Sequence, residues 1–101
     1  MATTSKALYR GAASTTTSTT LYTVPSATTT VVTDIVVVNT AGTAGSFTLA
    51  LDGVSIATTV TVGAYDSTVI PMKQVLATTK TITGGASATT INFHISGVEI
   101  A

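Results

Sequence analysis

The chain has 101 residues, which is enough for one domain and leaves no room for a separate catalytic or regulatory half. Its four Lys and Arg residues balance its four Asp and Glu residues, so the formal net charge is zero. Nucleic-acid binding depends on clustered cations that neutralise phosphates, and four scattered cations argue against such a partner. A surface with so few charges is poorly protected against association, which suits a protein that works within an assembly.

The sequence also bears on where the chain is made. It contains no cysteine, in keeping with folding in a reducing cytoplasm. Residues 1–6 lack the basic and apolar regions of a signal peptide, and the longest aliphatic run, residues 35–38, is too short to span a bilayer. We therefore expect synthesis in the cytoplasm, no signal peptide and no membrane partner.

Composition favours β-structure throughout. The 25 threonines, 12 valines and 7 isoleucines are β-branched, which disfavours helices and suits a pleated, half-buried sheet. Taken in chain order, the pattern predicts a short N-terminal arm over residues 1–6 and then eight strands, at residues 7–10, 20–24, 31–38, 47–51, 54–62, 67–72, 79–83 and 91–96.

Hydrophobic alternation predicts which faces of these strands are buried. Residues 47, 49 and 51 are apolar and alternate with Thr48 and Ala50, and Ile91, Phe93 and Ile95 alternate with polar residues, so each strand has one wet face. Residues 35–38 are apolar on both faces, which indicates a central strand covered on both sides.

Turn residues separate the strands. Asp52-Gly53 predicts a two-residue hairpin, Gly84-Gly85 a further reversal and residues 41–45 a longer loop, while Pro25 and Pro71 belong at strand ends or edges. We predict an all-β fold, a single domain over residues 1–101 built as a compact sandwich or small barrel of about eight short antiparallel strands. The sequence leaves jelly-roll and immunoglobulin-like topologies open.

The sequence offers no set of residues that predicts catalysis. His94 is the only histidine, and its polar neighbours Asn92 and Ser96 predict a surface or interface position. No nucleophile motif, phosphate-binding glycine motif, calcium loop or metal-ligand spacing is present, so we expect no enzyme, no cofactor and no metal. Asp52 is explained by its turn, whereas Asp34 predicts either strand-end hydrogen bonding or an interface ion pair.

Tyrosines and threonines are the remaining candidates for binding. Tyr9, Tyr22 and Tyr65 are candidates for interface anchors, for stacking on a sugar or for ordinary strand packing. The threonine runs lack a regular Thr-x-Thr period, so polar loops explain them better than ice binding does.

Four stretches, in this order, carry a resemblance: residues 21–25 (LYTVP), 35–40 (IVVVNT), 47–53 (FTLALDG) and 95–100 (ISGVEI). From about residue 7 to the end, the chain resembles small β-sandwich structural proteins of tailed bacteriophage particles. That family implies no catalytic residues. It implies a virion protein made in the host cytoplasm, either a capsid decoration (cement) protein or a tail-associated component.

The preferred hypothesis is a decoration protein that binds the outside of an assembled capsid and stabilises it by mass action. The expected partner is the major capsid protein, with tail proteins as the alternative, and we expect a homo-oligomer. The N-terminal arm and neighbouring edge strands would add contacts, including strand pairing. The alternative is a tail-tip or fibre-associated module that binds a host glycan or another tail protein. The predicted interface residues are Thr3, Thr4, Ser5, Tyr9 and Tyr22.

Overall fold

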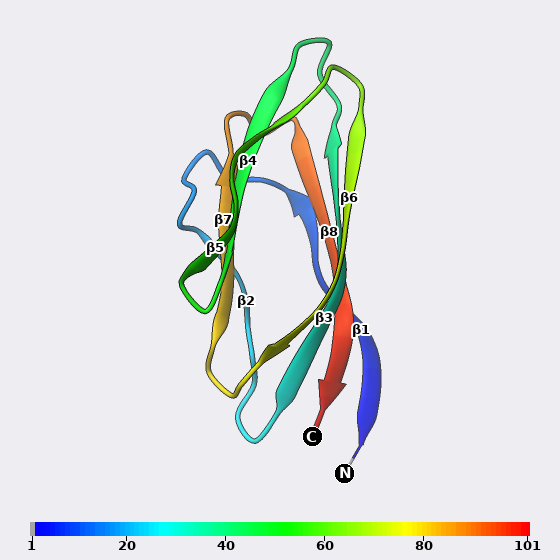
Figure 1. Ribbon diagram of the computed structural model, residues 1–101, viewed down its shortest axis with the longest axis vertical. Helices are drawn as coiled ribbons and strands as arrows, with labels where there is room; N and C mark the ends of the chain where they lie inside the picture. Colours follow the sequence, from blue (N-terminus) through cyan, green and yellow to red (C-terminus); the bar gives the residue numbers. More distant parts are fainter. Residues whose placement is uncertain (1) are drawn as a thin grey trace.

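The computed structural model describes residues 2–101, and its regular structure in this range consists of eight antiparallel strands. Figure 1 shows them in two layers. The strands are β1 (Thr3–Ala12), β2 (Thr20–Thr23), β3 (Thr29–Asn39), β4 (Gly45–Leu51), β5 (Val54–Val62), β6 (Ser67–Leu76), β7 (Thr81–Ala86) and β8 (Ile91–Ile100). Each predicted strand is present. Among residues 2–101, no helix is long and apolar enough to cross a membrane.

The strand order resolves the topology that the sequence leaves open. One sheet, here called sheet I, has the order β1-β8-β3-β6, and the other, sheet II, has the order β2-β7-β4-β5. An immunoglobulin-like sandwich keeps its first two strands in one sheet, whereas here β1 and β2 lie in different sheets. The arrangement is that of a jelly-roll sandwich. The fold class is therefore confirmed as all-β.

The predicted N-terminal arm covers residues 1–6, of which Met1 lies outside the described residues. Its remaining part differs from the expectation, because Thr3 to Lys6 belong to β1 and pair with the end of β8. Ala2 and Ala101 extend this pairing by exchanging backbone hydrogen bonds of 2.8 and 2.9 Å. Figure 1 accordingly shows the start of β1 beside the end of β8. The polar composition of the first residues concealed a strand whose pairing partner lies almost the whole sequence away.

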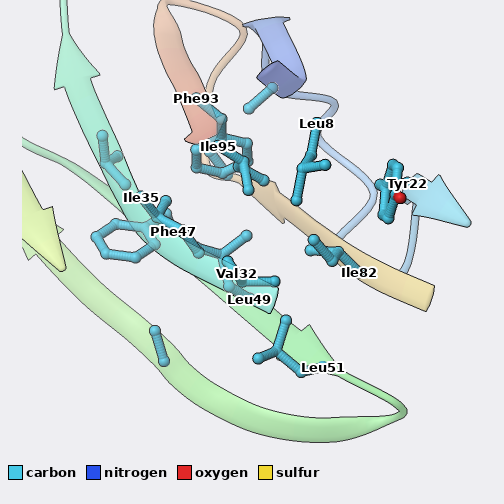
Figure 2. Packing of buried hydrophobic residues seen from close by; sticks show 14 of the residues in the cluster. Leu8, Tyr22, Val32, Ile35, Phe47, Leu49, Leu51, Ile82, Phe93 and Ile95 are labelled. Atoms are coloured by element: carbon cyan, nitrogen blue, oxygen red, sulfur yellow. The ribbon is translucent and has the colours of Figure 1, made fainter. Parts of the chain in front are cut away.

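The core lies between the two sheets and is formed by the inward faces of alternating strands (Figure 2). Phe47 of β4 and Phe93 of β8 meet edge to face, with ring centroids 6.2 Å apart. Leu49, Leu51, Ile91 and Ile95 are also buried, which confirms the alternation in both strands. An edge-to-face aromatic pair contributes roughly 0.5–1.5 kcal/mol beyond the burial of its area.

Two local features match the sequence-based expectations. Asp52 and Gly53 both have positive φ angles, 53° and 74°, and form the two-residue turn between β4 and β5. Pro71 lies in β6, an edge strand of sheet I, where the missing amide donor is tolerated.

Gly97 permits close packing at the centre of sheet I, because a Cβ there would be 2.8 Å from Leu8 Cδ1 and would also collide with the Val31 carbonyl oxygen.

The strand β3 departs from one expectation. It is central in sheet I, as predicted, but only one of its faces is covered. Ile35 and Val37 are fully buried in the core, whereas Val36 and Val38 point away from sheet II and are half-exposed. The prediction of cover on both sides is wrong for the isolated chain because the sandwich has two layers and supplies no third.

Candidate functional site

The two sheets present outer faces of different chemistry. In an antiparallel sheet, residues directly opposite each other on neighbouring strands point to the same face, so the strand register assigns each side chain to a side. Since Phe93, Ile95, Ile35 and Val37 point into the core, the residues that alternate with them form the outer face of sheet I.

The outer face of sheet I is rich in aliphatic side chains. Opposite residues form rows across it, such as Arg10, His94, Val36 and Val69, and further along the strands Ser5, Val98, Val31 and Val75. Val69 and Val75 are 60% and 66% exposed. We call this surface the valine face; its large aliphatic members are Val31, Val36, Val38, Val69, Val75, Val98 and Ile100.

The outer face of sheet II contains hydroxyl groups instead. Its rows are assigned in the same way, from strands whose alternate residues Leu49, Leu51 and Ile82 are buried. We call this surface the threonine face; its members are Thr20, Thr23, Ser46, Thr48, Ala50, Ser55, Thr61, Thr81, Thr83 and Gly85. None of these residues is charged and none is an aliphatic residue larger than alanine, so the centre of this face is more polar than the valine face. The exposed aliphatic residues of sheet II, Val54, Ile56 and Val60, lie along its edge strand β5.

The strand edges are less suited to pairing than the sequence suggests. The edge strand β6 contains Pro71 and Lys73, and in the edge strand β1 Lys6 turns toward Glu99, with 3.4 Å between Lys6 Nζ and Glu99 Oε2. The edge strand β5 has two register shifts and a left-handed residue, Thr59, with φ of 49°. Proline, lysine, inward-turned charge and bulges are the devices that prevent edge-to-edge pairing.

The predicted interface residues fall into four environments. Thr3 and Ser5 are exposed and lie on the valine face, opposite Ile100 and Val98, whereas Thr4 is exposed on the other side of β1. Tyr9 is half-buried against the core, and its hydroxyl group donates to the Ala12 carbonyl oxygen at 2.8 Å. These four residues remain candidates for partner contact.

Tyr22 lies inside the sandwich and is only 9% exposed. Its hydroxyl group donates to Glu99 and is 2.8 Å from the Thr30 hydroxyl group, which therefore donates to it. Burial, followed by the hydrogen bond to Glu99, raises the pKa of Tyr22 above its usual value of 10.0. The residue joins β2 to β3 and β8, and its burial removes it from the surface that a partner can touch.

The charged and titratable candidates occupy the outer surface. His94 is half-exposed on the valine face beside Asn92 and Ser96 in sequence, as expected, and lies between Arg10 and Val36 in its row. Asp34 is on the same face at a register shift of β3, opposite Ser96 and Pro71. The side-chain hydrogen bonds and ion pairs of the described residues include none from Asp34, so the predicted strand-end hydrogen bonding is absent there.

The remaining candidates have structural surroundings. Asp52 lies 3.6 Å from Lys80, an exposed ion pair beside the hairpin turn. Tyr65 is 78% exposed in the turn before β6. Residues 2–101 enclose no pocket and contain no group of three metal-ligating side chains.

Comparison with known proteins gives weak similarities. No protein-family model and no curated protein matches the sequence. The whole chain aligns with 81% of a chain in the cryo-EM structure of the virus-like particle of extra small virus from the giant freshwater prawn Macrobrachium rosenbergii, with 12% identity and a TM-score of 0.48. It also aligns over 96% of its length with 58% of a pentameric capsid protein isolated from metagenomic phage sequences, with 15% identity and a TM-score of 0.37. Similarities at this level do not assign the chain to a family.

Proposed function

We propose that the chain is a structural protein of a virus particle that acts by contact with neighbouring proteins and catalyses no reaction. One observation carries the proposal: the valine face leaves Val36 and Val38 of the central strand half-exposed although the sequence of that strand is apolar on both sides. A strand of this kind is typical of sheets covered on both faces. The missing cover is supplied by another protein molecule.

The opposite face supports the same orientation. The hydroxyl groups of the threonine face form hydrogen bonds with water as long as the face is exposed. This face therefore suits contact with solvent. In a particle, sheet I would therefore be covered by a neighbouring protein molecule and sheet II would stay in contact with water. Thr3 and Ser5 would take part in the contact, because they border the valine face.

The specific role that we propose is that of a capsid decoration protein, bound in many copies outside the assembled capsid. Support comes from the order of the four stretches that resemble virion proteins of tailed bacteriophages. A chain that binds only the assembled lattice stabilises it through mass action. The major capsid protein would be its partner, and synthesis would take place in the host cytoplasm.

A measurement of copy number tests this role. Quantitative mass spectrometry of purified particles of the virus that encodes the chain is expected to find it in hundreds of copies per particle, in a fixed ratio to the major capsid protein. Chemical removal of the chain is expected to lower the temperature at which the capsid opens. Absence of the chain from purified particles would contradict the virion role altogether.

Tyr65 favours a second candidate, a tail-associated module that binds a host glycan. Its ring is exposed on a turn, and an exposed tyrosine can stack on a sugar. Copy number separates the two roles, because a tail component would be present in only a few to a few dozen copies. Replacement of Tyr65 by Ala would then reduce adsorption to host cells, whereas a decoration protein would tolerate the change.

A further inference from the structure

We propose that the valine face binds a second copy of this chain, in a two-fold contact in which Arg10 of each copy meets Asp34 of the other. This inference rests on the proposed function, since it names the partner of the same face. It follows from the charges on the face and from its area.

Among residues 2–101, Arg10, Asp34, Lys73 and Asp66 form no ion pair, and Arg10 and Asp34 carry opposite charges. The two ion pairs among residues 2–101 join Lys6 to Glu99 and Lys80 to Asp52. Arg10 of β1 lies opposite His94 and Asp34 of β3 opposite Ser96, with β8 between them, so their backbones are about 12 Å apart. Both side chains nevertheless lie on the valine face, where one partner packed against the sheet would cover them together.

A two-fold contact gives each of these charges its opposite. In such a contact residue i of one copy meets residue j of the other, and residue j meets residue i. One rotation therefore forms two Arg10–Asp34 pairs, on either side of β8. Asp34 is half-buried before any partner binds, so covering it without a cation would be costly. A second copy supplies that cation without a further protein.

The other polar groups of the face are compatible with this contact. Lys73 lies on the edge strand β6, from which its side chain can stay in water. Asn92 and Ser96 of β8 are uncharged and flank His94 near the centre of the face. Among the described residues, Asp34 is the only carboxylate on the valine face, so no other negative charge of this face would repel it.

The area of the face is sufficient for a dimer. Four strands of about ten residues span about 33 Å by 19 Å, so close packing would cover roughly 600 Å² on each copy, or about 1,200 Å² in total. Specific interfaces bury about 1,200–2,000 Å², and the face reaches the lower end of that range. The aliphatic side chains provide the apolar centre, with Val36 and Val69 in the row that contains Arg10.

Sedimentation velocity of the full chain over a wide concentration range tests the proposal. The unmodified chain is expected to show a monomer–dimer equilibrium. Arg10→Asp and Asp34→Arg should each weaken dimerisation by roughly 30-fold or more, because each leaves a like-charged pair or an unpaired charge in the contact. The double variant Arg10→Asp/Asp34→Arg exchanges the two charges and is expected to restore dimerisation.

A matched pair of variants locates the contact. Val69→Arg places a cation on the valine face and should abolish dimers, whereas Thr61→Arg places the same group on the threonine face and should leave them unchanged. Circular dichroism and thermal unfolding confirm that each variant is folded. A merely structural role for Arg10 or Asp34 would lower stability in the single variants without rescue in the double variant.

Three outcomes would overturn the inference: a chain that is monomeric at every concentration, dimers that tolerate Val69→Arg, or a double variant that does not recover. A monomeric chain that is still found in hundreds of copies per particle would refute only the dimer. The virion role would then stand, with a different protein on the valine face.

Discussion

Tyr22 is the residue that most directly connects the two sheets. It comes from β2 in sheet II, and its hydroxyl group bonds to Thr30 of β3 and Glu99 of β8 in sheet I. Thr30 is fully buried, and Lys6 approaches Glu99 from β1. A buried polar group is costly when it lacks a partner, so the three side chains depend on one another.

Removal of the Tyr22 hydroxyl group should therefore be destabilising. We expect Tyr22→Phe to lower the free energy of unfolding by about 1–3 kcal/mol, because Thr30 and Glu99 each lose a hydrogen-bond partner. Chemical denaturation at neutral pH measures the effect. Tyr9→Phe is the matched control: its hydroxyl group bonds to an exposed carbonyl oxygen, so the loss should be below about 1 kcal/mol. Equal losses in both variants would contradict this account.

The same residue gives the fold a dependence on alkaline pH. Because burial and then Glu99 raise the pKa of Tyr22, the folded state favours the neutral phenol. This contribution to stability is fully present below the unfolded value of about 10 and is lost as pH rises through the higher folded value. The unmodified chain should lose more stability above pH 10 than Tyr22→Phe does. Parallel losses in the two proteins would exclude Tyr22 as the cause.

Tyr22 also shows what sequence patterns cannot predict about single residues. Its strand has only four residues, and its pairing with β7 shifts register between Thr20 and Tyr22. Simple alternation therefore fails to assign the inner side chain, and the tyrosine could be expected at a surface. The partners Thr30 and Glu99 are 8 and 77 residues away in sequence, and no local pattern links them.

At the scale of elements, each sheet has edges that resist pairing by different means. In β6 the edge contains Pro71 and Lys73, in β5 it contains two register shifts, and β2 is very short. These features protect the open edges against pairing, whereas Val69 and Val75 of β6 remain exposed on the valine face. Association through a face is favoured over association through an edge.

Removing the protection from one edge tests this distinction. The variant Pro71→Thr/Lys73→Thr restores an amide donor and removes the charge in β6, so we expect it to aggregate more strongly than the unmodified chain. Light scattering during incubation at fixed concentration measures this aggregation. A matched change in a loop, Lys80→Thr, should have a much smaller effect. Identical scattering from all three proteins would show that β6 needs no protection.

Most elements could be predicted from the sequence, because alternation and turn residues are local signals. The hairpin at Asp52-Gly53 and the strand over residues 54–62 were predicted to the residue. Strand ends were less accurate: β6 continues to Leu76 and β8 to Ile100, beyond the predicted limits. The reversal predicted at Gly84-Gly85 is wrong, because both glycines lie inside β7 and pair with β4. There, pairing with distant strands extends the sheet past the point where the local pattern weakens.

At the scale of the whole molecule, the apolar run at residues 35–38 contains the main functional signal. The run predicts cover on both faces of a central strand, and the chain provides cover on one. The error about the isolated chain thus indicates the face that we propose to be covered by a partner. The sequence could not reveal that Arg10 and Asp34 share this face, since only the order of β1, β8 and β3 brings them to it.

The absence of cysteine from the chain makes the central claim directly measurable. Single variants Val69→Cys and Thr61→Cys place one thiol on the valine face or on the threonine face. The rate of maleimide labelling is then compared between the dilute chain and the chain in purified particles. The account predicts that both thiols react in the dilute chain and that only Val69→Cys is protected in the particle. Equal labelling of the two thiols in the particle, or protection of Thr61→Cys alone, would contradict it.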